Sequence, residues 1–525
     1  MTASTSSACE RANSVKLTLR AILAAGGGLL AGVVAVAAPV SVPDTLLIRG
    51  GQVLDGTGSP PNRTDLRIRG DRILETGRLR PRNGERVISA AGAVVAPGFI
   101  DAHSHADGGI QEAPDAESQI RQGITTAIVG QDGGSQLPLS RFWSGLRTRR
   151  VALNFASFVG HGTLRREAMP GDPRRKATAG EVERMAKLLD EEMASGALGL
   201  SSGLEYDPGF FAETDEVIAL ARTAARRGGS YISHMRNEDN GAFEAIQELL
   251  KVAEQAHIPA QISHIKLGSR RVWGRASEVL EQIEAARRRG AILTADVYPY
   301  LYWQSSITLL NPSRKWDDRA AWEQGLEDIG GPQQVLLARY TPDATWAGRT
   351  VAQIAERTGK DAVSVIQEIV ANTRAPGATG SEAVVVTAMR EDDLRRFLAS
   401  PHIMICSDGG PRSPHPRSAG SYPRVLGRYV REEKVLTLEE AVRKMTSFPA
   451  ATFGFRDRGR LAPGWKADVV VFDPAVVSDT ATTAQPKARP LGIRHVLVNG
   501  VPVLLDDVLT GARPGEIVLR TERAR

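Results

Sequence analysis

The sequence predicts an α/β fold: a (β/α)8 TIM-like barrel with a small β-sandwich domain and an inserted subdomain before the eighth strand. Three observations lead to this prediction. Eight apolar runs alternate with helical stretches over residues 96–455, and both ends of the chain carry short strands separated by turns. The last two apolar runs also lie too far apart for a simple crossover helix.

The two terminal segments, residues 44–95 and 456–525, are predicted to form one β-sandwich domain. In both of them, short apolar stretches alternate with Gly, Pro and Asn residues that favour turns. The barrel would then be inserted between the two halves of this domain. The predicted strands include residues 46–51, 65–71, 87–95, 467–473, 493–505 and 516–520.

The barrel strands are predicted from near-continuous apolar runs, which are typical of parallel strands buried on both faces. Between them lie stretches with helical periodicity, and Thr178 with Glu181 and Thr437 with Glu440 fit capping boxes at helix starts. The predicted strands are residues 99–105, 125–131, 153–159, 197–202, 230–234, 259–264, 292–297 and 403–408, and the helices include 179–194, 215–227, 242–255, 277–289 and 438–445.

The connection between the seventh and eighth strands, residues 301–390, is predicted to be an inserted subdomain. It contains helical stretches of its own at residues 351–357 and 363–371. It begins at the C-terminal end of the seventh strand, which is the end at the barrel mouth. We therefore expect it to lie over the mouth.

The N-terminus, residues 1–38, is predicted to be an export signal, which places the protein in the periplasm or outside the cell. Lys16 and Arg20 precede an uncharged stretch at residues 21–38 that ends in the small-x-small pattern of a cleavage site. An uncleaved membrane anchor is the alternative, because the stretch approaches the length needed to span a bilayer. After cleavage we expect no membrane contact. Cys9 would leave with the signal, so the mature chain could form no internal disulfide.

The charge of the chain does not indicate a nucleic-acid partner. The formal net charge is +6 and the pI is about 9.4, but the Arg residues are scattered rather than gathered in one block. No nucleic-acid motif accompanies them, so we interpret them as solvated surface charge.

Histidines and carboxylates follow several of the predicted strands. His103 and His105 are one residue apart, so on a strand both side chains lie on the same face. The C-terminal strand ends of a barrel meet at one mouth, and imidazole with carboxylate suits zinc and its neighbours. We therefore expect a site for one or two metal ions, with His161 orienting a loop or a ligand rather than binding metal. The strand-end residues are His103, His105, Gln131, Asp132, His161, His234, His264 and Asp408.

Several motifs resemble those of the amidohydrolase superfamily, and specifically its D-aminoacylase (N-acyl-D-amino-acid deacylase) branch. The resemblance extends from about residue 44 to residue 520. A fourth strand without lysine, at residues 197–206, argues against the hydantoinase, dihydroorotase and isoaspartyl-dipeptidase branches. The motifs are APGFIDAHSH at residues 96–105, GLSSGLEY at 199–206, SHMR at 233–236, SHIK at 263–266, SDG at 407–409, the segment 415–432 and GWKAD at 464–468.

The resemblance implies roles for individual residues. His234 and His264 would hold a tightly bound Zn²⁺, His103 and His105 would frame a second, weaker site, and Asp408 would be a ligand or the general base. For the substrate, the implied residues are Lys266 and Arg417 as carboxylate binders, Tyr206 at the developing oxyanion and Tyr298 as a weaker candidate for the carboxylate.

One position departs from the branch. The resemblance implies a cysteine ligand at the end of the second strand, where this chain has Asp132. A carboxylate can bind or bridge zinc, but it is a harder ligand than a thiolate, so we expect a different metal affinity and preference. Cys406 lies on the same strand as Asp408 and is expected to be a buried core thiol.

These observations predict an exported, zinc-dependent hydrolase that removes the acyl group from small-molecule N-acyl-D-amino acids through metal-activated water. A D-amino-acid dipeptidase or a cyclic amide or lactone hydrolase of the same superfamily is the alternative. A non-enzymatic binding protein on a degenerate barrel would have lost its ligands, whereas this chain retains His103, His105, His234, His264 and Asp408. The oligomeric state is not predicted.

Overall fold

The computed structural model describes residues 45–520. The predicted export signal, residues 1–38, lies outside the described residues. Within the described range, no helix combines the length and the apolar character that crossing a bilayer requires.

The described chain contains the predicted (β/α)8 barrel, so the predicted fold class is confirmed. Its strands pair in parallel in chain order, with the third strand divided into β9 and β10. The first and last strands close the barrel just beyond their ends, where the Asp408 N–H donates to the His103 carbonyl at 2.9 Å and the His105 N–H donates to the Gly409 carbonyl at 2.8 Å. The strands are β7 (Phe99–Asp101), β8 (Ile124–Val129), β9 (Asn154–Ser157), β10 (Val159–Gly160), β11 (Gly199–Gly203), β12 (Ser230–His234), β13 (Ala260–Ile262), β14 (Leu293–Val297) and β19 (Ile403–Ile405).

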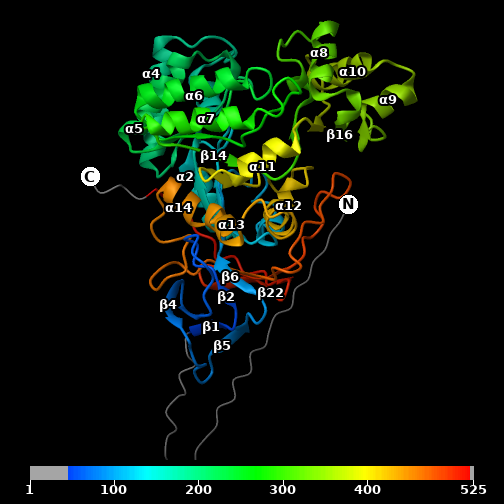
Figure 1. Cartoon of the computed structure of the whole chain (residues 1–525). Helices are drawn as coiled ribbons and strands as arrows, with labels where there is room; N and C mark the ends of the chain where they lie inside the picture. Colours follow the sequence, from blue (N-terminus) through cyan, green and yellow to red (C-terminus); the bar gives the residue numbers. More distant parts are fainter. Residues whose placement is uncertain (1–44, 521–525) are drawn as a thin grey trace, which may run out of the picture. The chain divides into compact units, whose positions relative to one another are not determined.

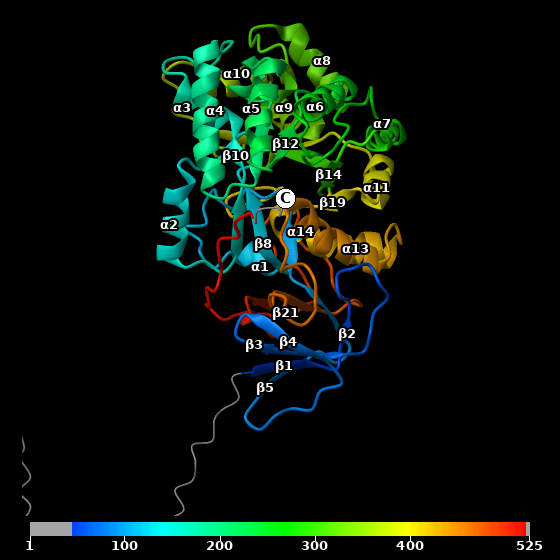
Figure 2. The same ribbon diagram turned by 90° about the vertical axis from the view of Figure 1, so that its left-hand side faces the viewer.

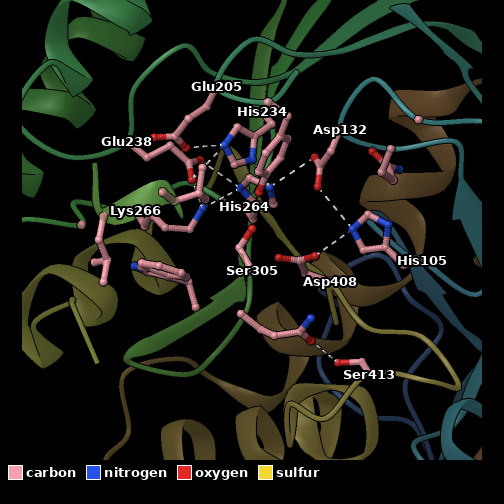
Figure 3. A pocket seen from close by; sticks show the side chains of 18 of the residues that line it. His105, Asp132, Glu205, His234, Glu238, His264, Lys266, Ser305, Asp408 and Ser413 are labelled. Carbon is pink, nitrogen blue, oxygen red and sulfur yellow. Dashed lines mark hydrogen bonds and ion pairs between the residues drawn. The ribbon is translucent and has the colours of Figure 1, made fainter. Parts of the chain in front are cut away.

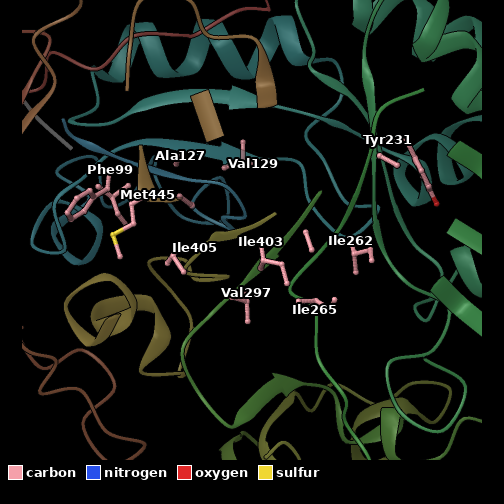
Figure 4. Packing of buried hydrophobic residues seen from close by; sticks show 14 of the residues in the cluster. Phe99, Ala127, Val129, Tyr231, Ile262, Ile265, Val297, Ile403, Ile405 and Met445 are labelled. Atoms are coloured by element: carbon pink, nitrogen blue, oxygen red, sulfur yellow. The ribbon is translucent and has the colours of Figure 1, made fainter. Parts of the chain in front are cut away.

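Apolar side chains from these strands form the barrel's main core (Figure 4). Ile262, Val297 and Ile403 are almost completely buried, as expected for parallel strands covered on both faces. This packing fixes the strand ends, and the strand ends carry the predicted site.

Helices surround the strands, and Figure 2 shows α4 to α7 beside β10, β12 and β14. The capping box predicted at Thr178 and Glu181 is formed, and the Thr437 hydroxyl accepts from the Glu440 N–H at 3.2 Å. The helices are α1 (Glu117–Ile120), α2 (Leu139–Arg149), α3 (His161–Ala168), α4 (Ala179–Ala194), α5 (Thr214–Arg226), α6 (Ala242–Ala256), α7 (Ala276–Arg288), α11 (Glu391–Ala399), α12 (Arg417–Arg424), the π-helix η4 (Val425–Glu432), α13 (Leu438–Met445) and α14 (Ser447–Phe453).

Two sheets form the small β-domain, one from the N-terminal segment alone and one from both terminal segments (Figure 1). The segments are joined where β6 pairs antiparallel with β20. Ile48, Leu66, Val95, Val471 and Leu497 belong to one shared core between the sheets. In order, the sheets are β4 (Arg72–Gly77), β3 (Asp65–Arg69), β1 (Thr45–Arg49) and β5 (Arg86–Ser89), and β2 (Gln52–Val53), β6 (Val94–Pro97), β20 (Val469–Phe472), β21 (Ile493–Val498), β22 (Val501–Leu505) and β23 (Val508–Leu509).

The C-terminal segment differs from the prediction, which placed residues 516–520 in the β-sandwich. Instead, Phe155 of β9 donates its N–H to the Glu516 carbonyl at 2.9 Å and accepts from the Val518 N–H at 2.7 Å. Those Phe155 groups point away from β8. On that side the chain entering β11 first reaches β9 at Ser157, whose carbonyl accepts from the Leu198 N–H at 2.9 Å. The segment thus satisfies backbone groups that the barrel would otherwise leave unpaired.

The inserted region between β14 and β19 is a subdomain with its own core around Trp322, Val335 and Ile366. The pairing of Tyr302 with Thr387 brings its two ends side by side. Helices were predicted here, but the antiparallel sheet was not. The elements are β15 (Tyr302–Ser305), α8 (Arg319–Ile329), β16 (Val335–Tyr340), β17 (Arg349–Thr350), α9 (Val351–Thr358), α10 (Ala362–Arg374) and β18 (Glu382–Thr387).

Candidate metal centre

Sharp turns position three of the predicted ligands directly after their strands. Asp132, His264 and Asp408 have φ angles of 54°, 31° and 48°, a region that non-glycine residues seldom adopt. Such conformations persist where the surrounding structure enforces them, and they gather at functional sites. The backbone therefore turns each side chain back over the barrel mouth.

Four of the predicted ligands form a first group, shown in part in Figure 3. His105 Nε2 lies 3.2 Å from Asp132 Oδ2 and 3.1 Å from Asp408 Oδ1. His103 Nε2 lies 3.4 Å from Asp132 Oδ1 and 3.7 Å from Asp408 Oδ1. The side chain of His105 is 40% exposed whereas that of His103 is fully buried, so this group is open to the cavity on the His105 side.

A second group lies beside the first and consists of Asp132, His234 and His264. His264 Nε2 is 3.2 Å from Asp132 Oδ1 and 3.0 Å from His234 Nδ1. Asp132 thus belongs to both groups. Of the predicted ligands, none lies away from these two groups.

The residues present fit a bound cation. Both ring nitrogens of His103, Asp132 Oδ1 and Asp408 Oδ1 are buried and have no hydrogen-bond partner. Buried polar atoms in folded proteins are normally hydrogen-bonded, so a gathering of unpaired imidazole nitrogen and carboxylate oxygen is typical of metal ligands.

The two carboxyl groups of the centre are ionised. Burial alone would raise the pKa of Asp132, but the imidazoles of His103 and His264 hold it well below its ordinary value. In the same way, the guanidinium of Arg417 outweighs burial and lowers the pKa of Asp408. Carboxylates must be deprotonated to bind a metal ion, so both groups are in the form that could bind one.

Two acidic residues that sequence reasoning missed lie against the second group. Glu205 Oε2 is 2.8 Å from His234 Nε2, and Glu238 Oε1 is 3.0 Å from His264 Nδ1. Glu205, His234 and Glu238 form a third cluster able to hold a cation. Glu205 follows the fourth strand, where a polar strand end was a usable signal, but Glu238 lies in a loop beyond His234 with no diagnostic spacing.

Another residue that sequence reasoning missed, Asp296 of β14, lies beneath two of the histidines. It accepts a hydrogen bond from the backbone N–H of His264 at 2.9 Å, and its Oδ1 lies 3.7 Å from His103 Nδ1, beyond hydrogen-bond distance. Asp296 therefore holds the backbone turn that carries the His264 side chain.

The predicted substrate residues all line a cavity of about 840 Å³ at the barrel mouth. Lys266 donates to Glu238 Oε2 at 2.5 Å, and Arg417 Nη1 lies 2.6 Å from Asp408 Oδ2. Both predicted carboxylate binders are thus already paired with acidic residues of the site. Tyr206 lies against the His234 ring at a centroid distance of 4.3 Å, and the hydroxyl of Tyr298 is buried without a partner.

His415 and Tyr298 hold the Arg417 side of the cavity. His415 Nδ1 accepts from the Arg417 N–H at 2.9 Å, while Nε2 lies 2.9 Å from the Tyr302 carbonyl and donates to it. Burial and the Arg417 charge keep the pKa of His415 well below its ordinary value, so this imidazole is neutral. The Arg417 guanidinium lies 4.7 Å from the centre of the Tyr298 ring.

The remaining predictions concern residues outside the centre. His161 is fully buried at the start of α3 and pairs through Nε2 with Glu216 at 2.8 Å, away from the ligand groups. Cys406 is a buried core thiol, as expected, and burial raises its pKa well above the ordinary value.

The inserted subdomain supplies part of the cavity wall. Trp303, Gln304 and Leu309 line the cavity, and Gln304 accepts from the Ser413 hydroxyl at 2.6 Å. Arg314 donates to the Glu205 carbonyl at 2.6 Å. The insertion therefore contacts both the ligand side and the Arg417 side of the site.

Comparisons with known proteins identify the family of the chain. The amidohydrolase family model matches residues 86–399 and 321–504. An N-acyl-D-glutamate deacylase from Alcaligenes xylosoxydans xylosoxydans is 38% identical over 499 residues, covering 90% of this chain and 96% of the relative.

Two solved structures are similar over nearly their full length. One is a D-aminoacylase whose structure concerns the functional role of its binuclear metal centre. Its TM-score is 0.81 and its identity 36%, and the match covers 91% of this chain and 99% of the other. The second is an N-acyl-D-glutamate deacylase from Bordetella bronchiseptica complexed with zinc and a phosphonate inhibitor, with a TM-score of 0.82, 37% identity and the same coverage.

Proposed function

Because the chain belongs to the amidohydrolase family and is an amide hydrolase, we propose that it is a zinc-dependent enzyme that removes the acyl group from N-acyl-D-amino acids. The proposal rests on similarity to deacylases of D-amino-acid derivatives over most of the chain. It also rests on a centre whose ligand types suit zinc.

The observation that carries the proposal is the convergence of unpaired buried atoms at the barrel mouth. His103, Asp132 and Asp408 present such atoms to one another, beside His234 and His264. His103, His105, Asp132, His234, His264 and Asp408 would hold the zinc. Bound there, zinc would act as a Lewis acid that polarises an amide carbonyl and acidifies water.

Asp408 is placed to move the proton in this reaction. Its Oδ2 is held by Arg417, whereas Oδ1 has no hydrogen-bond partner and faces His103 and His105. An ionised carboxylate held in this way accepts a proton at Oδ1 from water and returns it to the leaving amine.

Tyr206 and Arg417 are placed to act on the substrate. Burial raises the pKa of Tyr206 well above its ordinary value, so its hydroxyl stays protonated and can donate to the oxygen on which negative charge develops. Arg417 and the unpartnered Tyr298 hydroxyl form the side of the cavity suited to the substrate carboxylate. Lys266 contacts Glu238 and the His264 ring rather than the Arg417 side of the cavity. We assign it the role of holding these two side chains and of balancing the negative charge of Glu238.

The proposal is tested with matched enantiomers. Purified protein, prepared metal-free and zinc-loaded, is assayed for amine release from N-acetyl-D- and N-acetyl-L-amino acids. We expect zinc-dependent release from the D-enantiomers. Activity on neither enantiomer, or a clear preference for L, would refute the proposal, and parallel dipeptide and lactam substrates distinguish the alternative hydrolases.

We also propose that the protein is exported, on the basis of the residues 1–38 pattern. Cell fractionation with an antibody against the chain tests this. We expect the protein in the periplasm or medium with its N-terminus shortened, and a full-length cytosolic protein would contradict it.

A further inference from the structure

The cavity at the barrel mouth has room for a substrate larger than an N-acetyl-amino acid. Its volume of about 840 Å³ lies in the range of cavities that enclose drug-sized ligands. The proposed reaction uses the ligand groups, Tyr206 and the side that carries Tyr298 and Arg417, and leaves another part of the wall without a role. That part comes from the segments after the second and third barrel strands and includes Ser135, Gln136, Thr163 and Arg166.

The first turn of α3 is anchored to the loop that carries Asp132. The Thr163 N–H donates to the Gly133 carbonyl at 3.1 Å, and the Ser135 N–H donates to Thr163 Oγ1 at 3.0 Å. Arg166 lies three residues after Thr163 on the same helix, so the two side chains share a face, and both line the cavity. The Arg166 guanidinium is therefore presented to the cavity by a helix that is held beside the ligand groups.

Arg166 has no acidic partner among residues 45–520. In contrast, Lys266 and Arg417 line the same cavity and are each paired with a carboxylate, and the neighbouring Arg165 binds Glu216 at 2.5 Å. Burial lowers the pKa of Arg166, and no nearby carboxylate offsets this effect. Because arginine keeps its charge in proteins, this wall has a cation that is free to bind an anion from the substrate.

The place of Arg166 in the barrel assigns it to the acyl end of the substrate. The eight strands are arranged in chain order, so the third and the seventh lie opposite each other. Arg166 follows the third strand, whereas Tyr298 follows the seventh and lies against Arg417. In a trans amide, the carbon that bears the carboxylate and the first carbon of the acyl chain lie on opposite sides of the C–N bond. A substrate whose carboxylate meets Arg417 therefore extends its acyl chain toward Arg166.

We propose that Arg166 selects acyl groups that end in a second carboxylate, such as succinyl. This inference rests on the proposed function, because it names the acyl group that the same site removes. The guanidinium would bind the distal carboxylate through two parallel N–H···O bonds, the geometry that these two groups share. Water supplies a hydroxyl to the acyl carbon and a proton to the leaving amine as the C–N bond breaks, so the products are the dicarboxylic acid and the D-amino acid.

Two derivatives of one D-amino acid test this selectivity. N-succinyl-D-leucine and N-(4-methylpentanoyl)-D-leucine have acyl groups of the same shape, and only the first carries the second carboxylate. With zinc-loaded protein we expect kcat/KM for the succinyl compound to be at least about tenfold higher, the lower end of what hydrogen bonds to a charged group contribute. Arg166→Gln should remove this preference, and thermal melting shows whether the variant is folded.

Arg339→Gln is the matched control. Arg339 lines the same cavity from β16 and has no ion pair within the described chain, but it belongs to the inserted subdomain and not to α3. The preference for the succinyl compound should remain in this variant. Loss of the preference in Arg339→Gln as well would overturn the proposal, because the effect would then come from the overall charge of the cavity.

Other results would also overturn the proposal. One is equal kcat/KM for the two acyl groups in the parent, and another is a parent-like preference in folded Arg166→Gln. A loss in Arg166→Gln confined to N-acetyl-D-glutamate, compared with N-acetyl-D-leucine, would place Arg166 at the amino-acid side chain instead.

The proposed function fails separately, if zinc-loaded protein hydrolyses none of the D-derivatives. In that case isothermal titration calorimetry of the same protein with the two leucine derivatives still measures the selectivity. We expect Kd for the succinyl compound to be at least about tenfold lower in the parent and the two Kd values to be similar in Arg166→Gln. Equal Kd values in the parent would overturn the role of Arg166.

Discussion

Asp408 and Arg417 form an ion pair in which each residue has its own role in the proposed mechanism. Arg417 occupies one carboxylate oxygen of Asp408, and the other oxygen remains free beside the histidines. His415 in turn holds the Arg417 backbone and stays neutral. In the proposed mechanism, the residue that moves the proton is thus oriented by a cation, whose backbone is itself held by an imidazole.

Asp408→Asn should therefore lower kcat by about 10²- to 10⁴-fold, the usual loss when a general acid–base group is removed. The amide keeps the shape of the carboxylate but cannot accept the proton. Steady-state kinetics on an N-acetyl-D-amino acid measures the change, and thermal melting shows whether the fold is kept. A folded variant with a kcat close to that of the parent would exclude Asp408 as the base.

His161→Gln should leave the zinc content unchanged, because His161 pairs with Glu216 and not with the ligand groups. The change weakens a buried contact to a charged group, and we expect a loss of about 1–3 kcal/mol of stability. Elemental analysis and urea denaturation measure the two effects. Loss of zinc with an intact fold would place His161 among the ligands instead.

The Arg67–Glu85 pair stabilises one sheet of the β-domain, linking β3 to the segment before β5. Arg67 Nε lies 2.6 Å from Glu85 Oε1, and both side chains are almost fully buried. The hydrogen bond from Arg67 lowers the pKa of Glu85 from 4.5 to about 2. The folded state therefore binds fewer protons than the unfolded state between these pH values.

This pair predicts a pH-dependent difference between the parent and Glu85→Gln. The carboxylate contributes about 3 kcal/mol above pH 4.5, and this contribution is lost as the pH falls toward 2. Urea denaturation at about pH 6 should show the parent to be more stable, with the difference shrinking at about pH 3. An equal difference at both pH values would show that Glu85 does not titrate in this way.

At the scale of the whole molecule, a buried polar network joins the β-domain to the barrel. Asp468 beside β20 binds Arg458 and accepts from the Asn499 N–H at 2.8 Å. Asn154 of β9 accepts from Asn499 Nδ2 at 2.8 Å and from the Glu516 N–H at 2.9 Å. The β-domain, the barrel and the C-terminal segment are thus held at one junction.

Asp468→Ala should cost about 3–5 kcal/mol, because it removes the nearest and most buried acidic partner of the buried Arg458 guanidinium, whose other acidic contacts, Glu516 and Asp457, lie 3.4 Å and 3.8 Å away. The site lies at the other end of the strands, so the zinc content of the folded variant should stay the same. Thermal melting and elemental analysis test both statements. The control is Asp172→Ala, which breaks the exposed ion pair between Asp172 and Arg174 and should melt within a few degrees of the parent. If Asp468→Ala melted at the same temperature as the parent, the network at this junction would not contribute to stability.

The sequence was sufficient to predict the barrel and the convergence of the candidate ligands at its mouth, and the reason is physical. Buried parallel strands are continuous apolar runs, and their C-terminal ends meet whatever the loops do. Residues in loops lack such a constraint, which is why Glu238 and its pairing with Lys266 were missed. The insertion's antiparallel sheet was missed because short strands such as β17 (Arg349–Thr350) leave little periodicity. The pairing of residues 516–518 with β9 depends on a gap in the barrel that only the folded chain reveals.

A zinc titration of metal-free protein measures whether hydrolysis of a D-substrate depends on metal bound at the barrel mouth. Hydrolysis of an N-acetyl-D-amino acid and bound zinc are followed together in the same samples, with His234→Ala as the comparison. We expect hydrolysis to be absent without metal, to appear as zinc binds and to stay low in His234→Ala at the same zinc concentration. Hydrolysis of the D-substrate by protein that elemental analysis shows to be free of metal would contradict it.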